Sequence, residues 1–132
     1  MNRYQLYTRF RHAATAGHWR GHGIHSPMMY RFVREVAMPV RRRALAAAIV
    51  ERYGAERVAA VNSVAELTAL PADEAAETKR IVLLREPFRS AGERKTFAGW
   101  FDRTHVVAAH FQGLLVLFFD PKLQKQFFRI RN

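Results

Sequence analysis

Cysteine is absent from the 132 residues of this chain. Disulfide bonds and thiolate metal sites are therefore excluded, and we expect a protein of the reducing cytoplasm. Apolar runs such as Leu114 to Phe119 are far shorter than the roughly 20 apolar residues of a membrane-spanning helix. The first residues, Met1 to His12, lack the apolar core of a secretion signal. The sequence therefore predicts no membrane span and no membrane partner.

Acidic residues are scarce, since 11 Asp and Glu face 22 Lys and Arg, and the formal net charge is +11. The imbalance belongs to the two ends of the chain. Residues 1–43 contain nine basic residues and one acid, and residues 81–132 contain nine basic residues and four acids. Most of the basic residues are arginine, which binds phosphate or carboxylate through two parallel hydrogen bonds. This excess favours an anionic partner such as nucleic acid.

The first third of the chain has helical periodicity. Apolar residues recur every three to four positions over 2–15, which predicts a short helix. The histidine- and glycine-rich residues 18–25 predict a loop without regular structure. Ser26 is a good N-cap for a second helix over 27–38, and a third helix is predicted over 41–53.

The remainder of the chain alternates strands and helices. Four apolar stretches predict buried strands at 57–62, 81–84, 104–111 and 114–119. Capping boxes that begin at Ser63 and Ser90 predict helices after the first two, so those strands should be parallel. Gln112-Gly113 predicts a hairpin turn between the last two, and residues 127–131 alternate as a short edge strand would.

These patterns predict a single α/β domain over residues 1–132. It consists of a helical part, 1–39, and an α/β part, 40–132, with 49% apolar residues for its core. The expected fold is a three-layer, Rossmann-like arrangement around a small sheet of about four strands, of which the last two form an antiparallel hairpin.

The segment HGIHSPMMYRFV at 22–33 resembles an HGVHSPFVYDFV-like segment of bacterial class I S-adenosylmethionine-dependent methyltransferases. Residues 106–131, VVAAHFQGLLVLFFDPKLQKQFFRIR, resemble the closing strands of the same family, and the segment that begins at Ile81 resembles its IVVDDIYRS-like strand and helix. The resemblance implies a Rossmann-like methyltransferase fold. The family binds its cofactor at a glycine-rich turn after the first strand, with an acidic residue further on for the ribose.

This chain departs from the family where the cofactor would bind. The strand and turn at 58–65 contain no glycine, and family members are about twice as long as this chain. Arg85-Glu86 stands where the family has an acidic pair, and His110 stands where we expect Asp. The resemblance therefore implies a truncated or degenerate member without catalysis of its own. We expect no cofactor, and S-adenosylmethionine only if a partner completes the site.

Candidate site residues come from the family-like segment and from an arginine run at the start of the third helix. They are His22, His25, Ser26, Tyr30, Arg31, Arg41, Arg42 and Arg43. Two functions stay open for them: a binding or structural module derived from a methyltransferase, with a protein partner, and a small basic protein that binds nucleic acid or another polyanion.

Catalytic and metal-binding residues are not predicted. The three serines are each better explained as helix caps. His18, His22 and His25 are close enough in sequence to share a metal ion, but no acidic residue precedes Glu35 to orient them. We therefore predict no metal site, and oligomeric state stays open.

Overall fold

The computed structural model of the chain describes the backbone of residues 18–19 and 27–131 and the side chains of residues 27–130. The helix predicted over 2–15 lies outside the described residues. The same holds for three candidate site residues, His22, His25 and Ser26.

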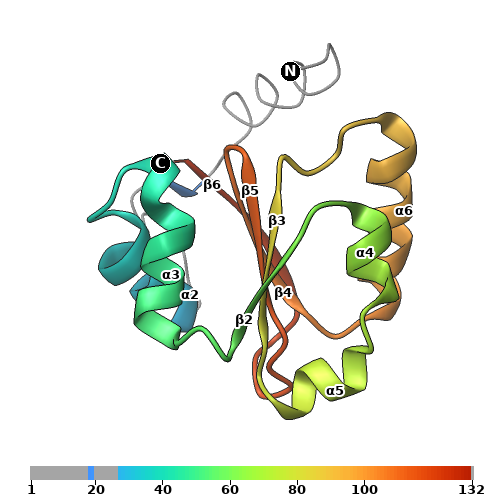
Figure 1. Cartoon of the computed structure of the whole chain (residues 1–132), viewed down its shortest axis with the longest axis horizontal. Coiled ribbons are helices and arrows are strands. Elements are labelled where there is room, and N and C mark those ends of the chain that lie inside the picture. The colour runs from blue at the N-terminus through green and yellow to red at the C-terminus, as the bar shows by residue number, and fades with distance from the viewer. Residues whose placement is uncertain (1–17, 20–26, 132) are drawn as a thin grey trace.

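The centre of the molecule is one mixed sheet with the strand order β1-β6-β4-β5-β3-β2 (Figure 1). Its strands are β1 (His18–Trp19), β2 (Val58–Val61), β3 (Ile81–Arg85), β4 (Val107–Phe111), β5 (Leu114–Phe118) and β6 (Gln126–Arg131). Among these described strands, only β5 is antiparallel to its neighbours, β3 and β4. The carboxyl ends of the other strands therefore meet the amino end of β5 at one edge, the upper edge in Figure 1, which we call the carboxyl edge.

The prediction of about four strands is too low, because the sheet continues beyond β4. Residues 18–19, predicted as part of a loop, form β1, a strand too short to leave a periodic pattern in the sequence. β6 is not the edge strand that was predicted, since it lies between β4 and β1 and is parallel to both. Its alternation has another cause: Phe128 and Ile130 are buried on one face of the sheet, and Phe127 packs on the other.

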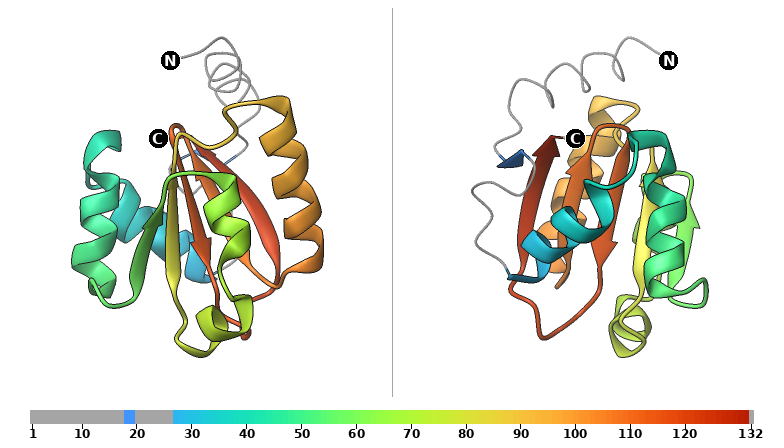
Figure 2. Two further views of the ribbon diagram at one scale, coloured as in Figure 1. Left: turned by 45° about the vertical axis from the view of Figure 1, so that its right-hand side comes forward. Right: turned by 90° about the vertical axis from the view of Figure 1, so that its left-hand side faces the viewer.

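Helices cover both faces of the sheet and produce three layers (Figure 2). One face carries α2 (Pro27–Phe32), a π-helical turn (Val33–Ala37), a 3-10 turn (Arg42–Ala44) and α3 (Leu45–Tyr53); the other carries α4 (Val64–Ala69), α5 (Ala72–Glu77) and α6 (Ala91–Arg103). Strand residues alternate between these layers. Ile81 and Leu83 belong to the core under α2 and α3, whereas Val82 and Leu84 belong to the core under α4 and α6.

The helix predicted after Ser26 is confirmed from Pro27 onward. Its predicted apolar face is confirmed as well, because Met29, Phe32, Val33 and Val36 are all buried. The helix widens at its end, where the Met38 amide donates to the Val33 carbonyl at 2.8 Å, a π-type bond. This face seals one side of the sheet.

The serine caps of both predicted capping boxes form on the opposite side of the sheet. The Ser63 hydroxyl accepts from the Glu66 amide at 3.1 Å, and the Ser90 hydroxyl accepts from the Glu93 amide at 3.1 Å. The Glu66 carboxylate in turn accepts from the Asn62 amide at 2.9 Å. These bonds satisfy backbone donors that a helix start would otherwise leave unpaired.

The predicted hairpin is confirmed, since β4 and β5 pair in antiparallel register around Gln112-Gly113. Gly113 adopts φ of +82°, which favours glycine because it has no Cβ. Every residue of β5 is buried. β2, predicted to be mostly buried, has only Val61 fully buried because it is the outermost strand on its side of the sheet.

Candidate functional site

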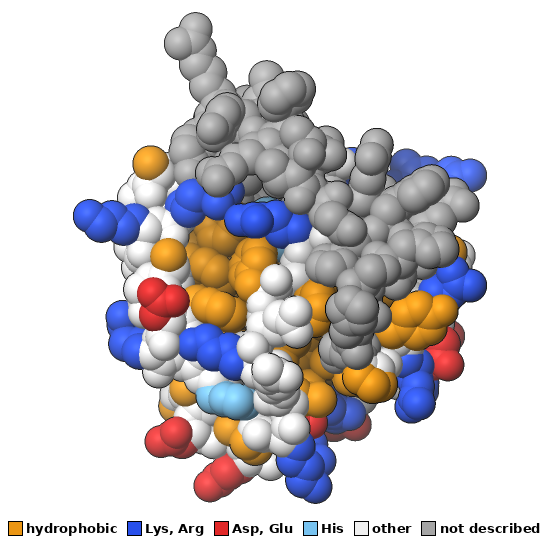
Figure 3. Space-filling view, turned by 180° about the vertical axis from the view of Figure 1, so that it is seen from behind, with side chains coloured by type: hydrophobic (Ala, Val, Ile, Leu, Met, Phe, Trp, Pro, Cys, Tyr) orange, Lys and Arg blue, Asp and Glu red, His pale blue; other side chains and the backbone are white. Residues whose placement is uncertain are grey.

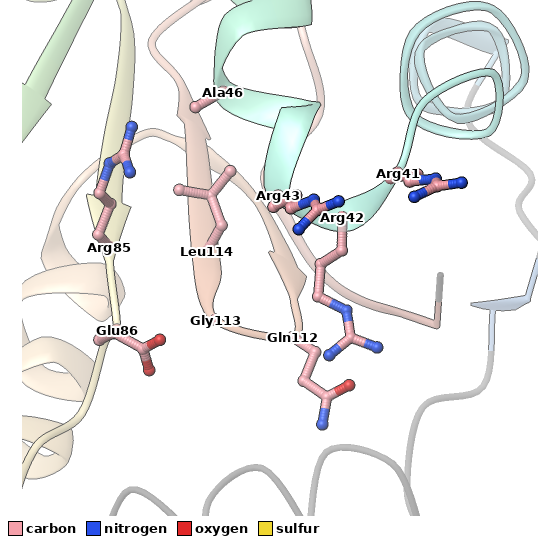
Figure 4. Close-up of a pocket in the computed structure, with 9 residues that line it drawn as sticks. All are labelled: Arg41, Arg42, Arg43, Ala46, Arg85, Glu86, Gln112, Gly113 and Leu114. Atoms are coloured by element: carbon pink, nitrogen blue, oxygen red, sulfur yellow. The ribbon is translucent and has the colours of Figure 1, made fainter. Parts of the chain in front are cut away.

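A pocket of about 570 Å³ lies at the carboxyl edge of the sheet, on the face covered by α3 (Figure 4). We call it the arginine pocket. Its lining residues are Arg41, Arg42, Arg43, Ala46, Arg85, Glu86, Gln112, Gly113 and Leu114. They come from three parts of the fold: the start of α3, the end of β3 and the hairpin turn.

The start of α3 supplies three of the arginines. Arg41 has an extended backbone, and the 3-10 turn of residues 42–44 begins at once after it, with the Ala44 amide donating to the Arg41 carbonyl at 2.8 Å. This tight turn presents three consecutive side chains at the helix start, and all three are exposed. Figure 4 shows the guanidinium groups of Arg42 and Arg43 across the hairpin turn from Arg85 and Glu86.

Arg85 and Glu86 form the opposite wall because β3 ends there. Arg85 pairs with Leu114 at the end of the ladder, and the Glu86 amide donates to the Gly113 carbonyl at 2.9 Å. Glu86 has φ of +45°, which is uncommon for a residue with a side chain. The loop after β3 and the hairpin turn are therefore tied together by backbone at the floor of the pocket.

The charge of the arginine pocket is strongly positive. Four guanidinium groups and one carboxylate line it. Within residues 27–131, the side chains of Arg41, Arg42, Arg43 and Arg85 form no ion pair or hydrogen bond. The helix dipole of α3 adds a partial positive charge at the same end. The arrangement is suited to anions, and above all to a phosphate or carboxylate group whose two oxygens each accept a bond from one guanidinium.

The structure separates the remaining sequence candidates from this pocket. Tyr30 is 46% exposed and Arg31 is exposed on α2, and neither lines the arginine pocket. His22, His25 and Ser26 lie outside the described residues. Of the predicted site residues that the structure describes, Arg41 to Arg43 are the ones brought together at the pocket.

Arg85 is the site residue that sequence reasoning missed. It was noticed only as a departure from the family-like acidic pair. A signal was available, since ligands in α/β folds bind beyond the carboxyl ends of strands and Arg85 directly follows the strand predicted at 81–84. The sequence did not predict that this strand end lies near the start of the third helix.

The turn after β2 is the place where the family resemblance puts the cofactor. Here the chain runs directly into α4, and both members of the capping box bind its own backbone. Ser63 has an extended backbone with φ of −153°, and no glycine allows close approach of a ligand. The turn after β2 therefore differs from the glycine-rich turn that the resemblance implies at this position.

Among residues 27–130, whose side chains are described, no group of three His, Cys, Asp or Glu could hold a metal ion. Ser63 and Ser90 both serve as helix caps. No described helix is long and apolar enough to cross a bilayer.

Comparisons of the chain with protein-family models, with curated proteins and with solved structures give no match. Any assignment of function therefore has to come from the chemistry of the arginine pocket and of the surfaces around it.

Proposed function

We propose that the chain is a cytoplasmic binding module of methyltransferase-like ancestry, without catalysis of its own, which binds the phosphate backbone of single-stranded nucleic acid at the arginine pocket. The observation that supports this proposal is the convergence of Arg85 with Arg41 to Arg43, four cations from two distant segments at one hollow of about 570 Å³. Arginines that served only solubility would be expected to lie spread over the surface, since like charges that are close together repel each other.

The chemistry of arginine accounts for the choice of ligand. A guanidinium group is planar and always charged, and its fork of donors matches two oxygens of one phosphate. Each phosphate that is neutralised releases condensed counterions, so affinity grows with the number of contacts and falls with salt. A single strand can bend its phosphates into a hollow, which suits this pocket better than a rigid duplex does.

The absence of catalysis is a separate part of the proposal. It is supported by the turn after β2, where the backbone that would approach a cofactor is bonded within a capping box. Calorimetric titration with S-adenosylmethionine and its demethylated product tests this part. We expect no heat of binding, and a micromolar dissociation constant for either compound would overturn it.

The salt dependence of oligonucleotide binding tests the arginine pocket. We expect the logarithm of the affinity for a labelled single strand to fall linearly with the logarithm of salt concentration. Replacing Arg41, Arg42 and Arg43 with Gln should reduce that slope by up to about two units, since each of three lost phosphate contacts removes about 0.7. Binding that is undetectable at low salt would contradict the proposal.

A matched control separates the pocket from general charge. Lys95, Arg103 and Lys122 are exposed and lie outside the arginine pocket, and their replacement with Gln removes the same net charge. We expect this variant to change the slope by less than about one unit, because its cations touch no phosphate. Equal losses in both variants would show diffuse attraction and no site.

A further inference from the structure

A second, smaller hollow of about 180 Å³ lies on the other face of the sheet, between α6 and β6. We call it the aromatic hollow. Figure 3 shows apolar side chains gathered in a depression that Lys and Arg side chains border. Its floor contains Phe88, Phe97, Phe101 and Phe127, which come from the loop after β3, from α6 and from β6.

The floor is one connected set of rings. The Phe97 ring lies 5.1 Å from that of Phe88, 5.8 Å from that of Phe101 and 6.0 Å from that of Phe127, measured between centroids. Phe88 and Phe97 are 2% and 5% exposed, whereas Phe101 and Phe127 are half-buried. An apolar surface of this kind is a typical anchor point for a side chain of a partner.

Three cations stand above these rings. The Arg94 guanidinium carbon lies 4.8 Å from the centre of the Phe88 ring, the Lys125 ammonium 4.8 Å from that of Phe101, and the Arg129 guanidinium carbon 5.5 Å from that of Phe127. Asp102 is the one acid that lines the hollow. The rim therefore carries an excess of positive charge around an apolar floor.

We propose that the aromatic hollow is the docking site of a short acidic segment of a partner protein, which inserts one aromatic side chain over the phenylalanines. A volume of about 180 Å³ accommodates one large side chain and little more. Carboxylates that flank this side chain meet Arg94, Lys125 and Arg129, while Asp102 accepts an amide hydrogen of the segment. Charge complementarity and the apolar anchor act together.

Other occupants match the rim less well. A second copy of the chain would bring another net charge of +11 to a positive surface. The chain's own first 34 residues include no acid, so they offer no carboxylate to the rim. A nucleobase needs an exposed ring face on which to stack, but Phe88 and Phe97 are buried and meet at an interplanar angle of 64°.

A synthetic peptide tests this docking site. The probe is fluorescein-labelled Glu-Glu-Phe-Glu-Glu, and its binding is followed by fluorescence anisotropy with the full chain. We expect Arg94→Glu to weaken binding by at least about tenfold, and replacement of the peptide Phe by Ala to do the same. The control is Lys95→Glu, the same charge change at an exposed residue of α6 outside the hollow, which should stay within about twofold.

The arginine pocket also attracts anions, so the triple Gln variant of Arg41 to Arg43 belongs in the same titration. Unchanged peptide affinity in that variant assigns binding to the aromatic hollow. Three results would overturn the docking site: equal losses with Arg94→Glu and Lys95→Glu, equal affinity for the alanine peptide, or displacement of the peptide by a single-stranded oligonucleotide. None of them bears on whether the arginine pocket binds nucleic acid.

Discussion

The helices on the two faces of the sheet begin in opposite ways. α4 and α6 start with a serine cap and a glutamate in the first turn. α3 starts after three arginines and has no side-chain cap. Negative charge stabilises a helix start and positive charge destabilises it, because the unpaired amides there carry a partial positive charge. The residues at the starts of α4 and α6 thus stabilise those helices, whereas the arginines before α3 destabilise its start.

This difference separates structural polar groups from those available to a ligand. The hydroxyls of Ser63 and Ser90 and the carboxylate of Glu66 each accept from a backbone amide. The arginines of the pocket stand exposed at a hollow. Substitution at the two kinds of helix start should therefore change different quantities: the free energy of unfolding on one face, and ligand affinity on the other.

The largest effect is expected from Leu117→Asp, because Leu117 belongs to the core under α4 and α6 and lies in β5, a strand that is buried along its whole length. Leu117 is fully buried in β5 between Val82 and Ala108 of the neighbouring strands. An unpaired carboxylate there should lower the free energy of unfolding by roughly 3 kcal/mol or more in urea denaturation. Gln124→Asp, at an exposed position, is the control and should be nearly neutral. A Leu117→Asp variant that unfolds like the parent protein would refute the buried hairpin.

Removal of a cap should have a smaller effect, confined to stability. Ser90→Ala leaves the Glu93 amide without its acceptor and should lower the free energy of unfolding by about 1 kcal/mol. Oligonucleotide affinity should be unchanged, since Ser90 lies outside the arginine pocket. Ser63→Ala provides a second test of equal size, because Ser63 makes the same bond. A loss of affinity in either variant would remove the distinction between the two kinds of helix start.

Replacing the arginine run should change the free energy of unfolding in the opposite direction. Replacement of Arg41, Arg42 and Arg43 with Gln relieves positive charge at a helix start, so the free energy of unfolding should rise by roughly 0.3 to 1 kcal/mol at low salt while nucleic-acid affinity falls. High salt should remove the gain in stability. Parallel urea titrations at low and high salt measure it, and a variant less stable than the parent would assign these arginines to the fold.

The smallest effect is expected at the other end of α3. Burial raises the pKa of Tyr53 above its ordinary value of 10.0, although the nearby Arg52 and Arg57 act in the lowering direction. The folded protein therefore holds this proton more tightly than the unfolded chain does. Stability should be complete below about pH 10 and should fall as the pH rises through the higher pKa of the folded state.

Urea midpoints measured at several pH values across that range test this dependence. Tyr53→Phe should reduce the loss of stability at high pH, whereas Tyr30→Phe, at a residue that is 46% exposed, serves as the control. Identical pH profiles for Tyr53→Phe and the parent protein would contradict the expectation.

Local signals in the sequence predicted the elements well. Three kinds of local signal are confirmed: the serine caps at Ser63 and Ser90, the glycine turn at Gly113 and the apolar face that begins at Met29. Each of them depends on neighbouring residues. Contacts between distant segments were not predicted. β6 joins the sheet beside β4, and Arg85 reaches the start of α3, through packing that no short window of sequence records.

The difference between local signals and distant contacts also explains which residues of the site were predicted. Arg41 to Arg43 were found because they are consecutive, which makes their charge visible in the sequence. Arg85 and Gln112 were missed because each is unremarkable beside its own neighbours and becomes part of a site only at the carboxyl edge. The aromatic hollow was missed for the same reason, since its phenylalanines come from three elements.

The turn at Gln112-Gly113 also bears on how the protein folds. It joins two paired strands within the shortest loop of the described sheet, whereas β3 and β5, and β4 and β6, pair only after longer stretches of chain have been closed. Hairpins form in about 1 to 10 μs, and distant pairings are slower. We expect pulsed hydrogen exchange during refolding to protect β4 and β5 first. The floor of the arginine pocket would then form before its walls pack beside it.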